Sequence, residues 1–206
     1  MYARQVRGQT LQFGVSGMLW ERSLVMYDRQ TDSLWSHLLG EAMAGEYAGE
    51  KLEVLPGLMS DWASWFAAHP ETTVLWLPRT ADQFRSDRLP SQQMVIGMSL
   101  AGKPYAWSLS YLSQHQPLQI EIEGFPLLVM MDEVSRAVRV FDRRVDEGPP
   151  RALHVEAGEI RDDRGGRWHS LSGLPLNSDA PLKPVPVIPS YRDAWLTFHP
   201  ESTLFD

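Results

Sequence analysis

The side chains that could do chemistry in this chain are six histidines and 26 acidic residues, spread over 206 positions. None of them falls into the spacing of a zinc protease, a phosphate-binding loop, a serine hydrolase or a calcium-binding loop. The chain has no cysteine, so a disulfide, a thiolate nucleophile and a cysteine-ligated zinc are excluded. The sequence therefore names no reaction, no cofactor and no small-molecule ligand.

One group of polar residues lies close together around Trp35. Asp28, Arg29 and His37 are candidate catalytic residues of an enzyme, for example a hydrolase, or could bind an anionic ligand. Arg29, Trp35 and His37 are the candidate ligand-binding residues. The structural alternative is that an Asp–Arg pair holds a turn and that Trp35 belongs to the core, because large aromatic side chains dominate cores. We expect this structural interpretation and assign no catalytic residue.

Two blocks of sequence occur twice. The pattern W-x-x-L-x-G begins at Trp35 and again at Trp168, and the pattern W-x-x-x-H-P-E begins at Trp65 and again at Trp195. The second block follows the first at similar spacing in both copies, so the chain is predicted to be a tandem of two related modules. The two histidines of the second block are either functional groups or residues that cap a helix C-terminus, and we expect the caps.

The first module is assigned to residues 1–77. Alternating apolar residues and turn signals predict short strands at 11–15, 23–27, 34–38, 52–55 and 73–77. Ser60 is the expected N-cap of a helix in which Trp62, Trp65 and Phe66 share one face. We expect that aromatic face to pack on the sheet.

Residues 78–93 are polar and proline-containing and are interpreted as a linker, and the second module is assigned to residues 94–206. Ser190 is the expected cap of a last helix whose face contains Trp195. Between Met94 and this last helix we predict a helix over 105–112 and a proline-rich loop over 174–189. We also predict strands at 95–100, 118–123, 127–131, 137–141, 152–156 and 167–171.

Composition limits the partners. The net charge of −7 disfavours a nucleic-acid partner, which needs clustered Lys and Arg. No apolar run reaches the roughly 20 residues of a membrane helix, and no signal peptide is recognised at the start. We therefore expect a soluble chain without membrane insertion, while the cellular compartment stays open.

The stretches FGVSGML at residues 13–19 and SLVMYDRQTDSLWS at residues 23–36 carry a family resemblance. They closely resemble the signature of a bacterial and archaeal family known as domain of unknown function 3179. His37 stands where that family usually has Gln. The resemblance covers nearly the whole chain, strongly over residues 2–77 and weakly over 94–205, and implies no activity.

The same resemblance places the family's histidine on His115 and its two cysteines on Asp132 and Ser135. Two cysteines beside a histidine would suggest a metal or redox site. In this chain only an oxygen-rich remnant would be left, with His115 and Asp132 as candidate metal ligands. One carboxylate and one histidine are too few to define a metal site, so none is assigned.

The resemblance also has a consequence for the first module. Met1–Gly8 resembles the residues that directly follow the family's cysteine-containing turn, so the module is expected to begin inside a domain. A strand edge at residues 8–16 would then be exposed and would need a cover. We expect either tight packing between the modules or a homodimer.

Together these observations predict a mainly β protein of the α+β class. Each of its two related modules would be a small curved antiparallel sheet or partial barrel with one packed helix. The expected function is that of a non-catalytic binding or interaction protein. The alternatives are an enzyme that uses His37, Asp28 and Arg29, and a remnant metal or redox site around His115, Asp132 and Ser135.

Overall fold

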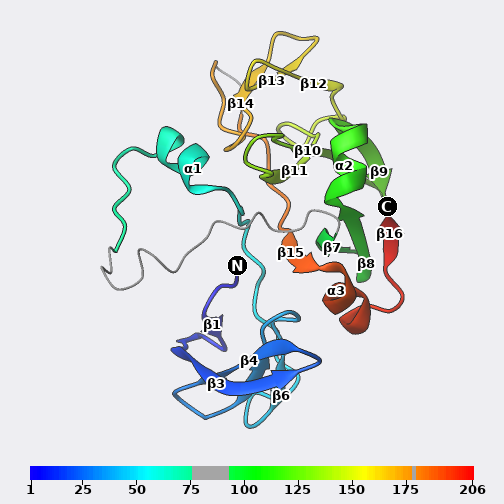
Figure 1. The fold of residues 1–206 in the computed structure, drawn as a ribbon. Coiled ribbons are helices and arrows are strands. Elements are labelled where there is room, and N and C mark those ends of the chain that lie inside the picture. The colour runs from blue at the N-terminus through cyan, green and yellow to red at the C-terminus, as the bar shows by residue number, and fades with distance from the viewer. Residues whose placement is uncertain (76–92, 178–179) are drawn as a thin grey trace.

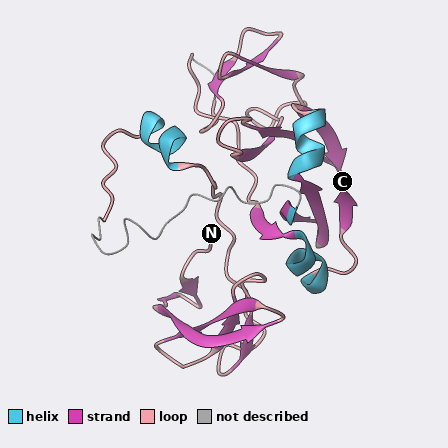
Figure 2. Cartoon of the chain, in the orientation of Figure 1, coloured by secondary structure: helices cyan, strands magenta, loops and turns pink. Residues whose placement is uncertain are grey.

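The computed structural model of the protein describes residues 1–75, 93–177 and 180–206 (Figure 1). Small sheets with short helices make up the described residues, and none of these sheets closes into a barrel (Figure 2). The expected α+β, mainly β class is confirmed. Over the same residues, no helix has the length and apolar character that crossing a membrane requires.

The first module contains a two-stranded and a four-stranded antiparallel sheet, and Trp35 is at the centre of their common core. Helix α1 (Trp62–Ala68) follows these sheets in the chain. The small sheet pairs β1 (Gln5–Val6) with β2 (Gln9–Thr10), and the larger sheet has the order β3-β4-β5-β6, formed by β3 (Phe13–Trp20), β4 (Ser23–Asp28), β5 (Leu34–Ser36) and β6 (Ala42–Ala44).

The second module contains three sheets and two helices, α2 (Leu109–His115) and α3 (Arg192–Phe198). The sheet β15-β7-β8-β16 consists of β7 (Met94–Leu100), β8 (Lys103–Ser108), β15 (Ile188–Tyr191) and β16 (Thr203–Phe205), and only the β16–β8 pair among these is parallel. The other two sheets are β11-β10-β9, with β9 (Leu118–Ile122), β10 (Phe125–Met131) and β11 (Val138–Asp142), and β12-β13-β14, with β12 (Leu153–Glu156), β13 (Glu159–Asp162) and β14 (Arg167–His169).

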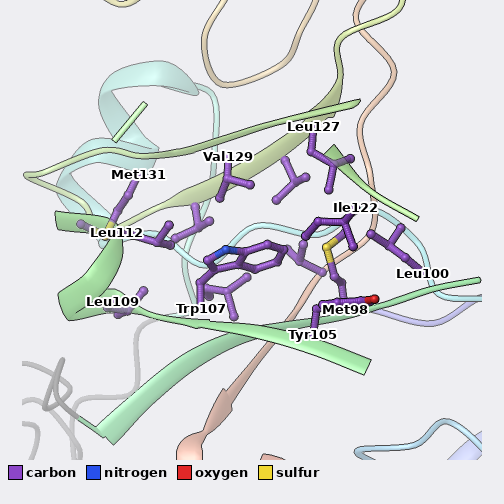
Figure 3. Close-up of a cluster of buried hydrophobic side chains, with 14 of the residues drawn as sticks. Met98, Leu100, Tyr105, Trp107, Leu109, Leu112, Ile122, Leu127, Val129 and Met131 are labelled. Carbon is purple, nitrogen blue, oxygen red and sulfur yellow. The ribbon is translucent and has the colours of Figure 1, made fainter. Parts of the chain in front are cut away.

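The largest core lies between β7–β8, the β11-β10-β9 sheet and α2. Trp107 is in its middle, surrounded by Met98, Leu112 and Val129 (Figure 3). Each of these side chains is buried almost completely, and burying a large apolar side chain contributes about 1.5–3 kcal/mol to folding. This core is one of three buried clusters in the described part of the second module and is separate from the first-module core around Trp35.

The predicted helix over 105–112 begins later than expected. Tyr105 and Trp107 belong to β8, and α2 begins at Leu109. The Ser108 hydroxyl accepts a hydrogen bond from the Tyr111 backbone N–H, which caps the helix there. A run of buried aromatic residues fits a strand between two packed layers as well as a helix, so periodicity alone could not place this boundary.

Both predicted helix caps are wrong by one residue. The N-cap of α1 is Asp61, whose carboxylate accepts from the Ser64 backbone N–H at 2.9 Å, rather than Ser60. The N-cap of α3 is Tyr191, which makes no side-chain cap bond, rather than Ser190. Ser190 instead lies inside the paired strand β15, which continues to Tyr191 and so reaches the start of the helix.

Two predicted strands of the first module are not formed. Residues 52–55 contribute one isolated bridge, between Tyr2 and Val54, and residues 73–75 are not paired in the described structure. The rest of the predicted strand at 73–77 and the linker at 78–93, except Gln93, lie outside the described residues. The division into residues 1–77 and 94–206 stays a prediction, and we keep the names first module and second module for these ranges.

The aromatic faces of α1 and α3 differ in burial, although their sequences match. Trp195 of α3 is buried, with 1% of its surface exposed, against Val95 and Ala106. Trp65 at the matching position of α1 is 37% exposed, and Trp62 is 51% exposed. The expectation that the α1 face packs on the first-module sheet is therefore wrong, because that sheet offers no surface beneath the helix (Figure 1).

The repeated W-x-x-L-x-G pattern is a repeated structure. Trp35 and Trp168 are both completely buried, and each is followed by a turn that closes on a glycine with positive φ, Gly40 at +63° and Gly173 at +70°. In both turns the glycine N–H donates to the backbone carbonyl of the residue after the tryptophan. Gly40 donates to the Ser36 carbonyl, and Gly173 donates to the His169 carbonyl. A side chain at either glycine would be strained by its φ alone.

The same aromatic contact closes both turns. A Cβ at Gly40 would lie 2.4 Å from the Tyr2 ring, and a Cβ at Gly173 would lie 2.6 Å from the Phe141 ring. Tyr2 forms an antiparallel bridge with Val54, and Phe141 forms one with Pro184. Tyr2 and Phe141 are therefore equivalent positions, which extends the duplication to the very start of the first module.

Replacing Gly97 by Ala tests the packing of α3. A Cβ at Gly97 would lie 2.3 Å from the Trp195 ring, so we expect the substitution to lower the free energy of unfolding by about 1–3 kcal/mol. Urea unfolding followed by tryptophan fluorescence measures the change. Ser99→Ala, at an exposed position of the same strand, is the control and should have a much smaller effect. Equal stability of Gly97→Ala and wild type would contradict this packing.

Candidate functional site

Asp28 is completely buried at the end of β4 and has all its hydrogen bonds satisfied locally. Its carboxylate accepts from Trp35 Nε1 at 2.9 Å, from the Thr31 backbone N–H at 2.7 Å and from the Gln30 backbone N–H at 3.2 Å. The Thr31 hydroxyl adds a further bond at 3.0 Å. The carboxylate thus ties the turn after β4 to the central tryptophan of the core.

These hydrogen bonds set the ionisation of Asp28. Burial by itself would raise the pKa of this carboxyl, but the hydrogen bonds from Trp35 and Thr31 favour the charged form more strongly. The pKa of Asp28 therefore lies below its ordinary value. A carboxylate held in this charged, saturated state has a structural role in the turn that needs no ligand.

The side chains of Arg29 and His37 lie away from the Asp28 carboxylate. The Arg29 guanidinium lies over the Tyr27 ring, 5.7 Å from its centroid, and the His37 backbone N–H donates to the Leu24 carbonyl. Desolvation and the positive charge of the N-terminal amino group lower the pKa of His37. Within the described structure, neither side chain bonds to Asp28, and no described cavity is lined by any of the three. The enzyme site that uses all three stays a prediction.

Trp35, the third candidate for ligand binding, is a core residue. None of its surface is exposed, and its ring packs edge-on against Phe13 at 5.5 Å and at a tilt against Tyr47 at 6.1 Å between centroids. Its one polar atom is bonded to Asp28. Both faces of the indole are thus covered by protein, as the structural interpretation expects.

The candidate metal ligands of the second module do not gather into one group. Asp132 accepts hydrogen bonds from the Ser135 backbone N–H at 2.6 Å and from its hydroxyl at 2.7 Å, which closes the turn between β10 and β11. His115 is exposed at the end of α2, stacks on Tyr111 and bonds the Tyr111 carbonyl through Nδ1. Over the described residues, no three His, Asp or Glu side chains are placed to hold a metal ion.

A cavity of about 820 Å³ opens beside that turn. Asp132 and Ser135 line it together with Arg139 and His169, which the sequence did not single out. Arg139 comes from β11 and His169 from β14, so no local pattern connects them with the turn. The Arg139 guanidinium donates to the Leu171 carbonyl at 2.5 Å, and partial burial lowers its pKa. Carboxylates and a guanidinium thus share the wall of this cavity.

Asp162 is the counterpart of Asp28 in the second module. Its buried carboxylate accepts from the Gly166 backbone N–H at 2.7 Å and pairs with Arg151 at 2.8 Å. Burial would raise its pKa, but the bonds from Arg151 and Gly166 lower it overall. The turn that follows Asp162 is shorter, because Asp162 precedes Trp168 by one residue fewer than Asp28 precedes Trp35.

Within the described residues, the rings of the two repeated histidines make no bond that caps a carbonyl. The ring of His69 packs on Trp65 with 4.1 Å between centroids, and the ring of His199 packs on Trp195 at the same distance. In both helices the cap is the histidine backbone N–H, which donates to the tryptophan carbonyl. Both histidines stand at the C-cap position, as expected, but the bond that ends each helix comes from the backbone.

One edge of the first-module sheet is apolar and is not covered by the described residues. β3 forms this edge, and its exposed apolar residues are Val15, Met18, Leu19 and Trp20. Trp20 is partly covered by an edge-on contact with Phe198 of α3, at 4.8 Å between centroids. The modules therefore touch at one end of β3, while Val15 and Leu19 remain 68% and 69% exposed.

Comparison with known proteins agrees with the duplicated architecture. The family model described as "Protein of unknown function (DUF3179)" matches residues 1–86 and, a second time, residues 81–202. No curated protein and no solved structure matches the chain. The two matches follow one another along the sequence, as the repeated tryptophan and glycine turns do.

Proposed function

Because this chain belongs to the family described as "Protein of unknown function (DUF3179)", we propose its function from its own surface: it is a non-catalytic binding or interaction protein. The observation that supports this proposal is the uncovered apolar edge at β3. Exposed apolar groups that gather on one element mark contact surfaces more often than scattered ones do. The partner proposed for this edge is a second copy of the chain.

The sequence of β3 favours pairing with another strand. Its eight residues, FGVSGMLW, contain no charged residue and no proline, the two features that usually protect an edge strand. The equivalent edge strand of the second module, β12, carries the exposed polar residues His154 and Glu156. Of these two equivalent edge strands, β3 lacks such protection and β12 has it, so β3 is the edge that we propose as the interface.

A second copy is the partner that satisfies this edge most directly. Antiparallel pairing of β3 with its own copy about a two-fold axis brings the same apolar residues together from both sides. It also pairs backbone groups that the edge leaves open. The ladder of β3 with β4 shifts between Val15 and Leu19, and this bend confines the proposed pairing to a short segment.

Sedimentation of the wild-type chain and of Leu19→Lys tests the homodimer. We expect the wild type to sediment with twice the 23.4 kDa mass of one chain. Leu19→Lys should weaken the dimer at least about tenfold, because a charge on an edge strand opposes pairing and must be desolvated.

Val134→Lys is the matched control. Val134 is 84% exposed in the turn between β10 and β11, so the variant adds the same charge at another apolar surface position and should remain dimeric. A wild-type chain that stays monomeric at all concentrations, or equal effects of the two lysines, would refute the proposed interface.

A further inference from the structure

Three consecutive elements of the second module enclose a β-hairpin. The hairpin is formed by β7 and β8, and the enclosing elements are β15, α3 and β16 (Figure 1). β15 pairs with β7, where Ser190 lies opposite Val95, and β16 pairs with the other side, where Leu204 lies opposite Ala106. The helix covers the face between them. We call these three elements, residues 188–205, the filled clamp.

The contact at the centre of the filled clamp depends on a glycine. Trp195 lies so close to Gly97 that a Cβ there would be 2.3 Å from the indole. Val95 and Ala106 complete this small, flat surface under the ring. A hairpin with a larger residue in place of Gly97 would not admit the tryptophan.

The first module repeats the clamp with the same internal geometry. Residues 58–75 contain the segment equivalent to β15, then α1, then the segment equivalent to β16. Trp65 Nε1 donates to Thr72 Oγ1 at 3.0 Å, as Trp195 Nε1 donates to Ser202 Oγ at 2.8 Å. The C-caps match as well, with φ and ψ of −136° and 68° in α1 and of −134° and 66° in α3.

The clamp of the first module holds no hairpin among the described residues. Trp65 is 37% exposed where Trp195 is 1% exposed, and Val74 and Leu75, in the segment equivalent to β16, are 65% and 83% exposed. Residues 58–60 and 73–75 form no ladder with any described strand. Met59 packs partly against the large core of the second module, which holds the start of the clamp in place.

We propose that residues 58–75 are a binding site for an apolar β-hairpin of a partner protein. One strand of that hairpin pairs antiparallel with residues 58–61, and the other pairs parallel with residues 73–75, as β7 and β8 do in the filled clamp. The partner strand has a glycine at the position that contacts the Trp65 ring, as Gly97 contacts Trp195. Backbone bonds set the register of the hairpin, Trp65 supplies the central apolar anchor, and the requirement for glycine opposite the indole provides the specificity. This site is separate from the β3 edge.

The chain's own hairpin supplies the probe. A head-to-tail cyclised, fluorescently labelled peptide with the sequence of residues 94–108 is titrated with the full chain, and binding is followed by fluorescence anisotropy. We expect saturable binding by the wild-type chain. Trp65→Ala should weaken it at least about tenfold, because a central aromatic anchor dominates the affinity of such interfaces. Amide exchange of residues 58–61 and 73–75 should slow in the complex.

Two controls separate specific docking from adhesion of an apolar peptide. The peptide with Gly97→Leu keeps every other apolar residue and should bind at least about tenfold more weakly. The chain variant Ala67→Thr introduces the exposed Thr197 of the filled clamp and should bind like wild type. No binding by the wild-type chain, or equal binding by Trp65→Ala, overturns the proposal. Self-association that Trp65→Ala abolishes would also overturn it, because the occupant would then be a second copy.

Discussion

Replacing Trp195 by Ala is expected to lower the free energy of unfolding by about 3–5 kcal/mol. The indole is buried on Gly97, Val95 and Ala106, so its removal leaves a cavity between α3 and the sheet. The bond to Ser202 is lost at the same time. Urea unfolding with linear extrapolation, followed by circular dichroism, measures the change.

Trp65→Ala is the matched comparison within the same chain. Trp65 has the same neighbours inside its helix, His69 and Thr72, but no described strand packs beneath it as β7 does beneath Trp195. The expected loss is about 1 kcal/mol or less, because the side chain is already partly hydrated. Equal losses for the two variants would contradict the difference in burial. A large loss for Trp65→Ala alone would mean that α1 is covered in solution by the chain itself.

The second large effect is expected at Asp28. Asp28→Ala leaves Trp35 Nε1 and the Thr31 backbone N–H without acceptors in a buried turn, and each such loss costs about 1–3 kcal/mol. We expect a total loss of about 3 kcal/mol. Asp28→Asn retains an acceptor of similar shape and should lose less. Asp163→Asn, at an exposed neighbour of the equivalent Asp162, should change stability by less than about 0.5 kcal/mol.

The same carboxylate predicts a dependence on pH. The folded-state pKa of Asp28 lies below its ordinary value of about 3.9, so the stabilisation is fully present above that value. It is lost as the pH falls from about 4 toward the lower pKa of the folded state. Unfolding curves between pH 7 and pH 2 should therefore converge for wild type and Asp28→Asn. A constant difference down to pH 2 would show that the charge of Asp28 is not the source of its effect.

Local sequence was sufficient for the class of fold and for the turns. The alternation around Val15 and Val25 placed the first two strands of the larger sheet, and the polar run after Asp28 placed its turn. The spacing of Trp35 and Gly40 identified the duplicated turn. A turn that needs a positive φ favours glycine, so the same glycine recurs in both copies. These features depend on residues a few positions apart.

The candidate sites were harder to predict, because they bring together residues that are far apart in the sequence. Asp28 could be associated with the nearby Trp35 from the sequence. Asp162 was not recognised as its counterpart, because the turn between Asp162 and Trp168 is shorter by one residue. Arg139 and His169 line one cavity, but thirty positions of sequence separate them. Pairing across that distance is decided by sheet packing, which no single-sequence pattern contains.

By itself, the sequence determined that this is a mainly β member of its family with two repeated turns and two repeated aromatic helices. Only the tertiary structure decided that Trp195 is core while Trp65 is surface, although both lie in the same local motif. The physical reason is that a side chain on a helix is buried only when a second surface packs against it. Gly97 and its hairpin provide the second surface for α3, whereas no described strand packs on α1 as β7 packs on α3.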